Sequence, residues 1–298
     1  MSRTCSPSTQ RRYGLARVCR VWELARSTVY LHQERRATPR GPAAAKRGPK
    51  PRWSDEVLIE KIRAVLEAAP FLGEGHRKVW ARLRWQEIRT SKARVLRLMR
   101  DAQLLAPTRV GHAHGPKAHD GRITTDAPDE MWGMDATSYL TRDEGNATVF
   151  VVVDHCATEC IALHAARPGT RFEAVEAVRQ GVRTIFGGYA EGIATGLLAR
   201  HDHGSQYVSA YLQDELKFLG IESSPAFVRE PQGNGVAERF IRTLKEQLLW
   251  VRTFATVEEL RLALLEFKDR YNREWLCERH AHQTPAAVRA LTTRRKAA

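Results

Sequence analysis

Three acidic residues, Asp135, Asp202 and Glu238, are candidates for binding a metal ion or taking part in catalysis. Asp135 lies inside a run that should be buried in a strand, where a carboxylate is costly unless a cation pairs with it. Asp202 follows a short apolar stretch that predicts a strand, and the carboxyl ends of strands are where α/β proteins bind ligands. Glu238 lies in a long helical pattern. If folding brings the three acids together, their oxygens are ligands of the kind that hard divalent cations prefer.

The helix that carries Glu238 divides by residue spacing into two faces. Apolar residues recur at every fourth position and predict the buried stripe, which consists of Val236, Phe240, Leu244 and Leu248. Glu238, Arg242 and Lys245 follow one another at i, i+4 and i+7, so an acid and two cations project from a different stripe. Taken alone, this spacing is also typical of an ordinary surface ion pair.

The acids and their neighbours form a more specific pattern than the acids alone. Asp202 and Glu238 are separated by 35 residues. With their flanking residues, the acids resemble the second-frame, OrfB-type transposase of the insertion-sequence-three family. The matching segments are 132–137, 201–207, 233–245, Tyr271-Asn272, His280 and Thr284-Pro285, with 17–20, 26–30 and 94–99 in the N-terminal half. The resemblance therefore extends over nearly the whole chain.

The resemblance implies a fold and a reaction for the C-terminal half. The catalytic core of this family is similar to retroviral integrases and has a ribonuclease H-like fold. Asp135, Asp202 and Glu238 would then be both catalytic residues and metal ligands for two Mg²⁺ or Mn²⁺ ions, about 4 Å apart. The implied activity is that of a DDE-type polynucleotidyl transferase, which cleaves DNA strands and transfers them at transposon ends by two-metal phosphoryl transfer.

Further side chains are candidates for DNA contact. Four cations without an intervening acid share a predicted helix that begins after Ser91, namely Lys92, Arg94, Arg97 and Arg100. The alternative for this helix is a solvated basic face. Arg242 and Lys245 are suited to meet the phosphates that flank the scissile bond. Gln206 and Asn234 are candidates for orienting DNA or a metal-bound water.

The charge of the chain is unevenly distributed. The 298 residues carry a formal charge of +14. Residues 1–125 hold 27 Lys and Arg against 10 Asp and Glu, whereas residues 126–298 hold 21 against 24. A front-loaded positive field favours nucleic acid, which is bound by phosphate neutralisation. A solvated basic arm is the alternative explanation.

Stretches rich in proline and glycine interrupt the helical and strand patterns and divide the chain into segments. We predict a helix-turn-helix-like segment at 1–37, in which Ser27 caps the second helix, and a basic linker at 38–53. A helical DNA-binding module follows at 54–106 and a second linker at 107–127. The integrase-like catalytic core is expected at 128–290 and a basic tail at 291–298.

The catalytic half alternates between strand and helix patterns. Expected strands are 132–140, 147–153, 160–165, 196–200 and 221–226, with a turn at 144–146, and expected helices are 171–186, 210–219 and 235–250. Three strands in a meander followed by β-α units predict a mixed sheet with helices packed on it. The predicted fold class is therefore α/β, a mixed five-stranded sheet with flanking helices, preceded by small all-α helix-turn-helix-like modules. The resemblance implies that this sheet is ribonuclease H-like.

The partners follow from the resemblance and from the composition. Double-stranded DNA is expected as transposon terminal repeats and as target. The resemblance implies an upstream-frame, OrfA-type partner, joined by a frameshift or separate, and a homo-oligomer in the active complex. Five scattered cysteines and the lack of a long apolar run favour a reducing cytoplasm over a membrane. The resemblance implies that this is a bacterial cytoplasm and that the protein acts at the nucleoid.

Two other functions share these features. A non-catalytic DNA-binding regulator or inactive transposase remnant would keep the fold without the activity, although the intact set of three acids counts against it. A metal-dependent nuclease without strand transfer would use the same three acids. Strand cleavage and joining assays distinguish the three.

Overall fold

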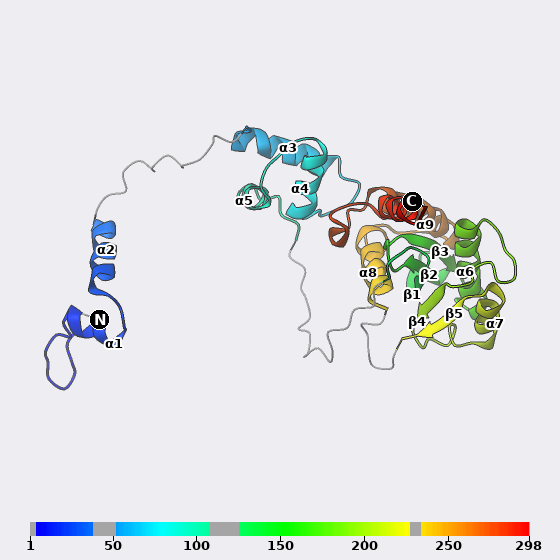
Figure 1. The fold of residues 1–298 in the computed structure, drawn as a ribbon, viewed down its shortest axis with the longest axis horizontal. Coiled ribbons are helices and arrows are strands. Elements are labelled where there is room, and N and C mark those ends of the chain that lie inside the picture. Colours follow the sequence, from blue (N-terminus) through cyan, green and yellow to red (C-terminus); the bar gives the residue numbers. More distant parts are fainter. Residues whose placement is uncertain (1–3, 38–51, 108–124, 227–233, 298) are drawn as a thin grey trace. The chain divides into compact units, whose positions relative to one another are not determined.

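The computed structural model describes residues 4–37, 52–107, 125–226 and 234–297 (Figure 1). The chain divides into two compact units, Met1–Trp53 and Ser54–Ala298. The first unit contains α1 (Leu15–Val21) and α2 (Arg26–Ala37). Ser27, the expected N-cap, lies inside α2, because the helix already begins at Arg26. Most of the expected linkers 38–53 and 107–127 lie outside the described residues.

The second unit begins with three short helices that share a core. These are α3 (Asp55–Glu67), α4 (His76–Trp85) and α5 (Lys92–Asp101). The buried side chains of this module include Leu58, Ile62, Val65, Val79, Leu83, Val95, Leu98 and Met99. Ser91 caps α5 as expected, since its hydroxyl accepts a hydrogen bond of 3.1 Å from the Arg94 amide.

A mixed sheet of five strands forms the centre of the second unit. The strands are β1 (Met131–Thr141), β2 (Gly145–Asp154), β3 (Cys160–Ala166), β4 (Leu198–His201) and β5 (Glu222–Pro225), in the order β3-β2-β1-β4-β5. β1, β2 and β3 pair antiparallel, whereas β4 and β5 continue the sheet parallel to β1. The expected mixed five-stranded sheet is confirmed.

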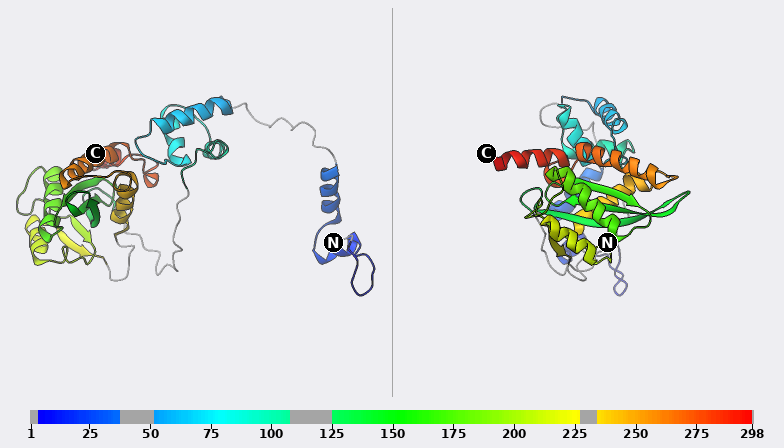
Figure 2. Two further views of the ribbon diagram at one scale, coloured as in Figure 1. Left: turned by 180° about the vertical axis from the view of Figure 1, so that it is seen from behind. Right: turned by 90° about the vertical axis from the view of Figure 1, so that its right-hand side faces the viewer.

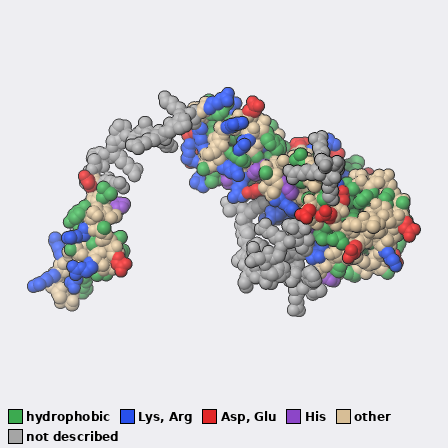
Figure 3. Space-filling view, in the orientation of Figure 1, with side chains coloured by type: hydrophobic (Ala, Val, Ile, Leu, Met, Phe, Trp, Pro, Cys, Tyr) green, Lys and Arg blue, Asp and Glu red, His purple; other side chains and the backbone are tan. Residues whose placement is uncertain are grey.

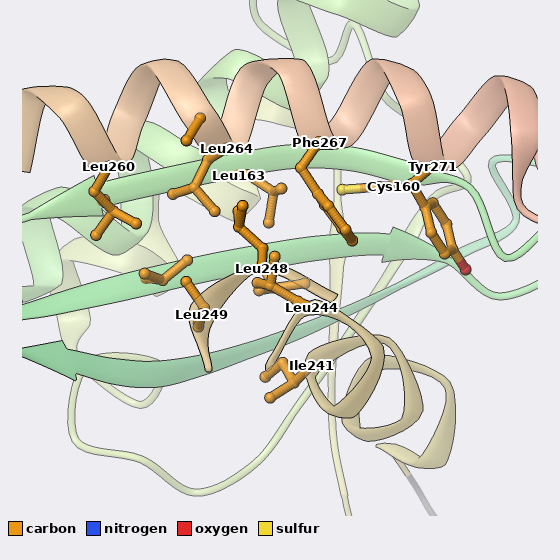
Figure 4. Packing of buried hydrophobic residues seen from close by; sticks show 14 of the residues in the cluster. Cys160, Leu163, Ile241, Leu244, Leu248, Leu249, Leu260, Leu264, Phe267 and Tyr271 are labelled. Atoms are coloured by element: carbon orange, nitrogen blue, oxygen red, sulfur yellow. The ribbon is translucent and has the colours of Figure 1, made fainter. Parts of the chain in front are cut away.

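Helices cover both faces of this sheet (Figure 2). Trp132, Met134 and Val152 project to the face covered by α6 (Arg171–Phe186) and α7 (Ala210–Leu219). Alternation sends their neighbours to the opposite face. There, β2 packs against α8 (Gly235–Leu244) and α9 (Val257–Glu274), through Val149, Val151, Phe240, Leu244 and Phe267. Figure 4 shows α9 laid along the strands with Leu260, Leu264, Phe267 and Tyr271 pointing at them.

Some boundaries differ from the expected ones. The helix expected over 235–250 is α-helical only to Leu244, and Lys245–Leu249 form a π-helical turn. The turn expected at 144–146 lies earlier, because Gly145 already pairs with Thr141 as the first residue of β2. Two further helices, α9 and α10 (Pro285–Ala297), were not among the expected elements. No helix among the described residues is both long and apolar enough to cross a membrane.

Candidate active site

Asp135 lies in the middle of β1, opposite Val151 of β2. Its Oδ1 accepts a hydrogen bond of 2.7 Å from the backbone amide of Ala136. Burial raises the pKa of Asp135 to about 6, and the negative charges of Asp202 and Glu238 add to the rise. Those two carboxylates therefore lie close enough to act on Asp135 through space.

Asp202 directly follows the last residue of β4 and is exposed. Its Oδ1 accepts a hydrogen bond of 2.9 Å from the amide of Gly204. A Cβ at Gly204 would lie 2.9 Å from that oxygen and 2.8 Å from Nε2 of Gln206. The absence of a side chain at Gly204 thus lets the Gln206 amide approach the Asp202 carboxylate.

His201 anchors the loop that carries Asp202. Its Nδ1 lies 2.6 Å from the carbonyl oxygen of Asp202, and its Nε2 lies 2.9 Å from Oγ of Ser223 in β5. The carbonyl can only accept, so Nδ1 donates to it and Nε2 accepts from the Ser223 hydroxyl. Burial lowers the pKa of His201, which agrees with a neutral ring.

Glu238 is exposed in the first turn of α8. The positive end of the helix dipole favours an acid at this position, whereas desolvation raises the pKa of the carboxyl. Asp135 is the acid whose pKa, already raised by burial, is raised further by the negative charges of the other two. Within the described parts of the chain, no three His, Cys, Asp or Glu side chains already converge as a metal-binding group. The acids are neighbours across the site rather than a closed ligand cluster.

Comparisons with known proteins match both halves of the chain. The family described as "Integrase core domain" matches residues 219–285, and the family described as "HTH-like domain" matches residues 53–112. Transposase InsD for insertion element IS2 of Escherichia coli is 28% identical over 209 residues, which cover 68% of this chain and 68% of that protein. The chain is a homologue of insertion-element transposases.

Solved structures similar to this transposase homologue include two viral integrases. The catalytic core domain of BIV integrase is 19% identical, with a TM-score of 0.42, over 57% of this chain and 99% of that one. A simian T-cell lymphotropic virus intasome in complex with PP2A regulatory subunit B56 gamma is 16% identical, with a TM-score of 0.46, over 78% and 74%. By its homology to InsD and its integrase core domain, the transposase homologue is in the integrase and transposase class of polynucleotidyl transferases.

In this chain, two cations follow Glu238 along its helix. Lys245, the first residue of the π-helical turn, is near enough to lower the pKa of Asp135. Arg242 is more exposed and donates a hydrogen bond of 3.0 Å to Glu246. Of these two predicted DNA contacts, Lys245 is therefore the one that also acts electrostatically on the carboxylates.

Asn234 and Tyr207 have surroundings that the sequence analysis did not foresee. Asn234 is buried, and its Nδ2 donates to the carbonyl oxygen of Met134. Tyr207 is only 2% exposed, its hydroxyl has no hydrogen-bond partner among the described residues, and its ring stacks on His201. Burial raises the pKa of this phenol, and the charges of Asp135 and Asp202 add to the rise, so Tyr207 lies within electrostatic range of both acids. Tyr207 falls within the matching segment 201–207, but no role was predicted for its side chain, since a tyrosine after a loop is ordinarily a core residue.

The four predicted DNA-contact cations of α5 have different surroundings. Arg94 donates two hydrogen bonds, of 2.8 and 2.6 Å, to Oδ1 of Asp55, and Arg97 donates one of 2.7 Å to Oδ2. Lys92 lies 4.5 Å above the centre of the Trp80 ring. Arg100 is exposed in the last turn of the helix. Arg94 and Arg97 thus tie α5 to α3 within the module.

Proposed function

We propose that Asp135, Asp202 and Glu238 are the catalytic carboxylates of a DDE-type transposase that cleaves and joins DNA strands at transposon ends. The observation that carries the proposal is the placement of the three acids in β1, directly after β4 and in the first turn of α8, where the charges of Asp202 and Glu238 add to the rise that burial causes in the pKa of Asp135. Acids from a strand interior, a strand end and a helix start concentrate negative charge at one place. Structural proteins avoid such repulsion unless a cation or a reaction requires it.

The residues present fit divalent cations. Carboxylate oxygens are the donors that Mg²⁺ and Mn²⁺ prefer, and a cation would offset the repulsion that raises the pKa of Asp135. The hydroxyl of Tyr207 has no hydrogen-bond partner among the described residues and lies within electrostatic range of Asp135 and Asp202, so it can support a carboxylate that holds a cation. Two bound ions would activate the attacking oxygen and stabilise the leaving oxygen.

The side chains around the acids orient the reactants. Lys245 provides a positive charge next to Asp135, where a DNA phosphate would otherwise meet only carboxylates. Gln206 presents its amide beside Asp202, where it can hydrogen-bond a DNA oxygen or a metal-bound water. Arg242, exposed one turn beyond Glu238, extends the positive charge toward the flanking phosphates.

The helical module α3–α5 holds the DNA outside the active site. Lys and Arg side chains gather on its surface in Figure 3. Lys92 and Arg100 are the α5 cations that carry this part of the proposal, because Arg94 and Arg97 are engaged with Asp55. An OrfA-type partner and self-association on the transposon ends complete the active complex.

A strand assay tests the proposal. Labelled terminal-repeat DNA is incubated with Mg²⁺ or Mn²⁺ and the protein, with and without its OrfA-type partner. We expect cleavage and joining by the wild type, and loss of both in Asp202→Asn and Glu238→Gln with DNA binding retained. Undiminished cleavage in these variants contradicts the catalytic assignment. Cleavage without joining indicates a nuclease, and DNA binding without cleavage indicates a regulator.

A further inference from the structure

The side-chain amide of Asn234 connects the strand of Asp135 to the helix of Glu238. Asn234 is 4% exposed, and its Nδ2 donates a hydrogen bond of 2.8 Å to the carbonyl oxygen of Met134. Met134 precedes Asp135 in β1, and Asn234 directly precedes α8, four residues before Glu238. Because a carbonyl oxygen only accepts hydrogen bonds, the amide nitrogen must be the atom that faces it.

Asn234 occupies the N-cap position of α8 without capping the helix through its side chain. Asparagine is favoured at this position because its oxygen usually accepts from an amide in the first turn. Here Oδ1 is buried and has no hydrogen-bond partner among the residues described. Leaving a buried acceptor unpaired is costly. The side chain therefore bonds to β1 and makes no capping hydrogen bond to α8.

Gly133 makes this approach possible. A Cβ at Gly133 would lie 3.0 Å from Oδ1 of Asn234 and 3.0 Å from Nε2 of His155. The φ angle of Gly133 is not in the left-handed region, so the backbone conformation does not require glycine. What requires glycine is the close contact of Asn234 and His155 with the sheet.

We infer that Asn234 is a positioning residue that sets Glu238 relative to Asp135 from inside the protein. The inference rests on the proposed function, because it concerns the spacing of two proposed metal ligands. It replaces direct contact with DNA or a metal-bound water as the role of this side chain. A buried amide already engaged with Met134 is poorly placed to reach either.

Two variants remove the contact from opposite sides, and a third serves as a matched control. Asn234→Ala removes the amide, and Gly133→Ala pushes a Cβ against its oxygen. Asn272→Ala is the control, because Asn272 also joins a helix to a strand. Its amide bonds the carbonyl and amide of Cys160 at 2.8 and 2.9 Å. All variants are made in the full-length chain and checked for cooperative thermal unfolding.

Two measurements decide the matter. Calorimetric Mn²⁺ binding is expected to weaken about tenfold in Asn234→Ala and Gly133→Ala, as is typical when an outer-shell partner is removed, and to stay unchanged in Asn272→Ala. Affinity for terminal-repeat DNA in EDTA is expected to stay within twofold of wild type in all three. Wild-type Mn²⁺ binding by both site variants, or DNA affinity reduced fivefold or more in Asn234→Ala alone, overturns the inference. Wild-type Mn²⁺ binding by Asp135→Asn and Glu238→Gln would instead overturn the proposed function.

Discussion

The imidazole of His201 holds the backbone carbonyl of Asp202 at 2.6 Å while its other nitrogen accepts from Ser223. One buried ring thus connects the last residue of β4, the start of the Asp202 loop and β5. The direction of the carboxylate at Asp202 depends on this anchor, because the acid itself is exposed and bonds only a nearby loop amide among the contacts described.

Replacing His201 by phenylalanine tests the anchor. The aromatic ring keeps its stacking on Tyr207, but both hydrogen bonds are lost. We expect strand cleavage to fall about 10- to 100-fold, because small displacements of a reacting group are costly in rate. DNA affinity in EDTA should stay unchanged, and Ser223→Ala should show a smaller loss. Wild-type cleavage by His201→Phe would show that Asp202 needs no such support.

Asp135 should make stability depend on pH in the absence of metal. Its pKa is about 6 in the folded protein and about 3.9 in an unfolded chain, so ionisation opposes folding. The free energy of unfolding should therefore fall as pH rises from about 4 to about 6. Above that range, Asp135→Asn should be more stable than wild type by on the order of 1 kcal/mol, since partial exposure reduces the effect.

Urea unfolding in EDTA at pH 4 and pH 7.5 measures this difference. The difference between the two proteins should be much smaller at pH 4, where the folded-state carboxyl is protonated and the unfolded-state carboxyl is about half protonated. Asp154, whose pKa burial also raises to about 6, is present in both proteins and cancels. A variant less stable than wild type at pH 7.5 would mean that Asp135 is held by favourable contacts instead of repulsion.

Arg94 and Arg100 form a matched pair for separating a structural cation from a DNA contact. Arg94→Ala removes the bonds to Asp55 and should lower the free energy of unfolding by about 1 kcal/mol. Arg100→Ala should leave the free energy of unfolding unchanged and weaken DNA binding. The slope of log affinity against log salt concentration should become shallower by about 1, because one phosphate contact is lost. Equal effects of the two variants on the salt slope would show that Arg94 also contacts phosphate.

The N-terminal arm should contribute a large share of the salt dependence of DNA binding. Residues 1–50 carry 12 Lys and Arg against 2 Asp and Glu. If they neutralise phosphates, affinity falls steeply with salt, and deletion of residues 1–50 flattens that slope. Binding isotherms between 50 and 200 mM salt measure it, in the range where phosphate contacts differ most. An unchanged slope after deletion identifies the arm as merely solvated.

The sequence was informative where periodicity is local. The β-branched run of β2, the cap at Ser91 and the buried stripe of α8 all follow from neighbouring residues, and each was predicted. α9 also carries a regular apolar stripe, at Val257, Leu260, Leu264 and Phe267, so its signal was present but was not recognised.

Features that depend on distant residues could not be predicted. The hydrogen bond from Asn234 to Met134 joins residues 100 positions apart. The proximity of Tyr207 to Asp135 arises only when β4 pairs with β1. The switch from α- to π-helical bonding at Lys245 leaves the apolar stripe almost unchanged, so spacing alone does not reveal it.

Calorimetric titration of Mn²⁺ into the metal-free protein measures whether Asp135, Asp202 and Glu238 form a shared metal site. We expect binding to wild type and a loss of at least tenfold in affinity in each of Asp135→Asn, Asp202→Asn and Glu238→Gln. Asp214→Asn, an exposed acid on α7, should bind like wild type. Unchanged affinity in any of the three site variants would contradict a shared metal site built from these carboxylates.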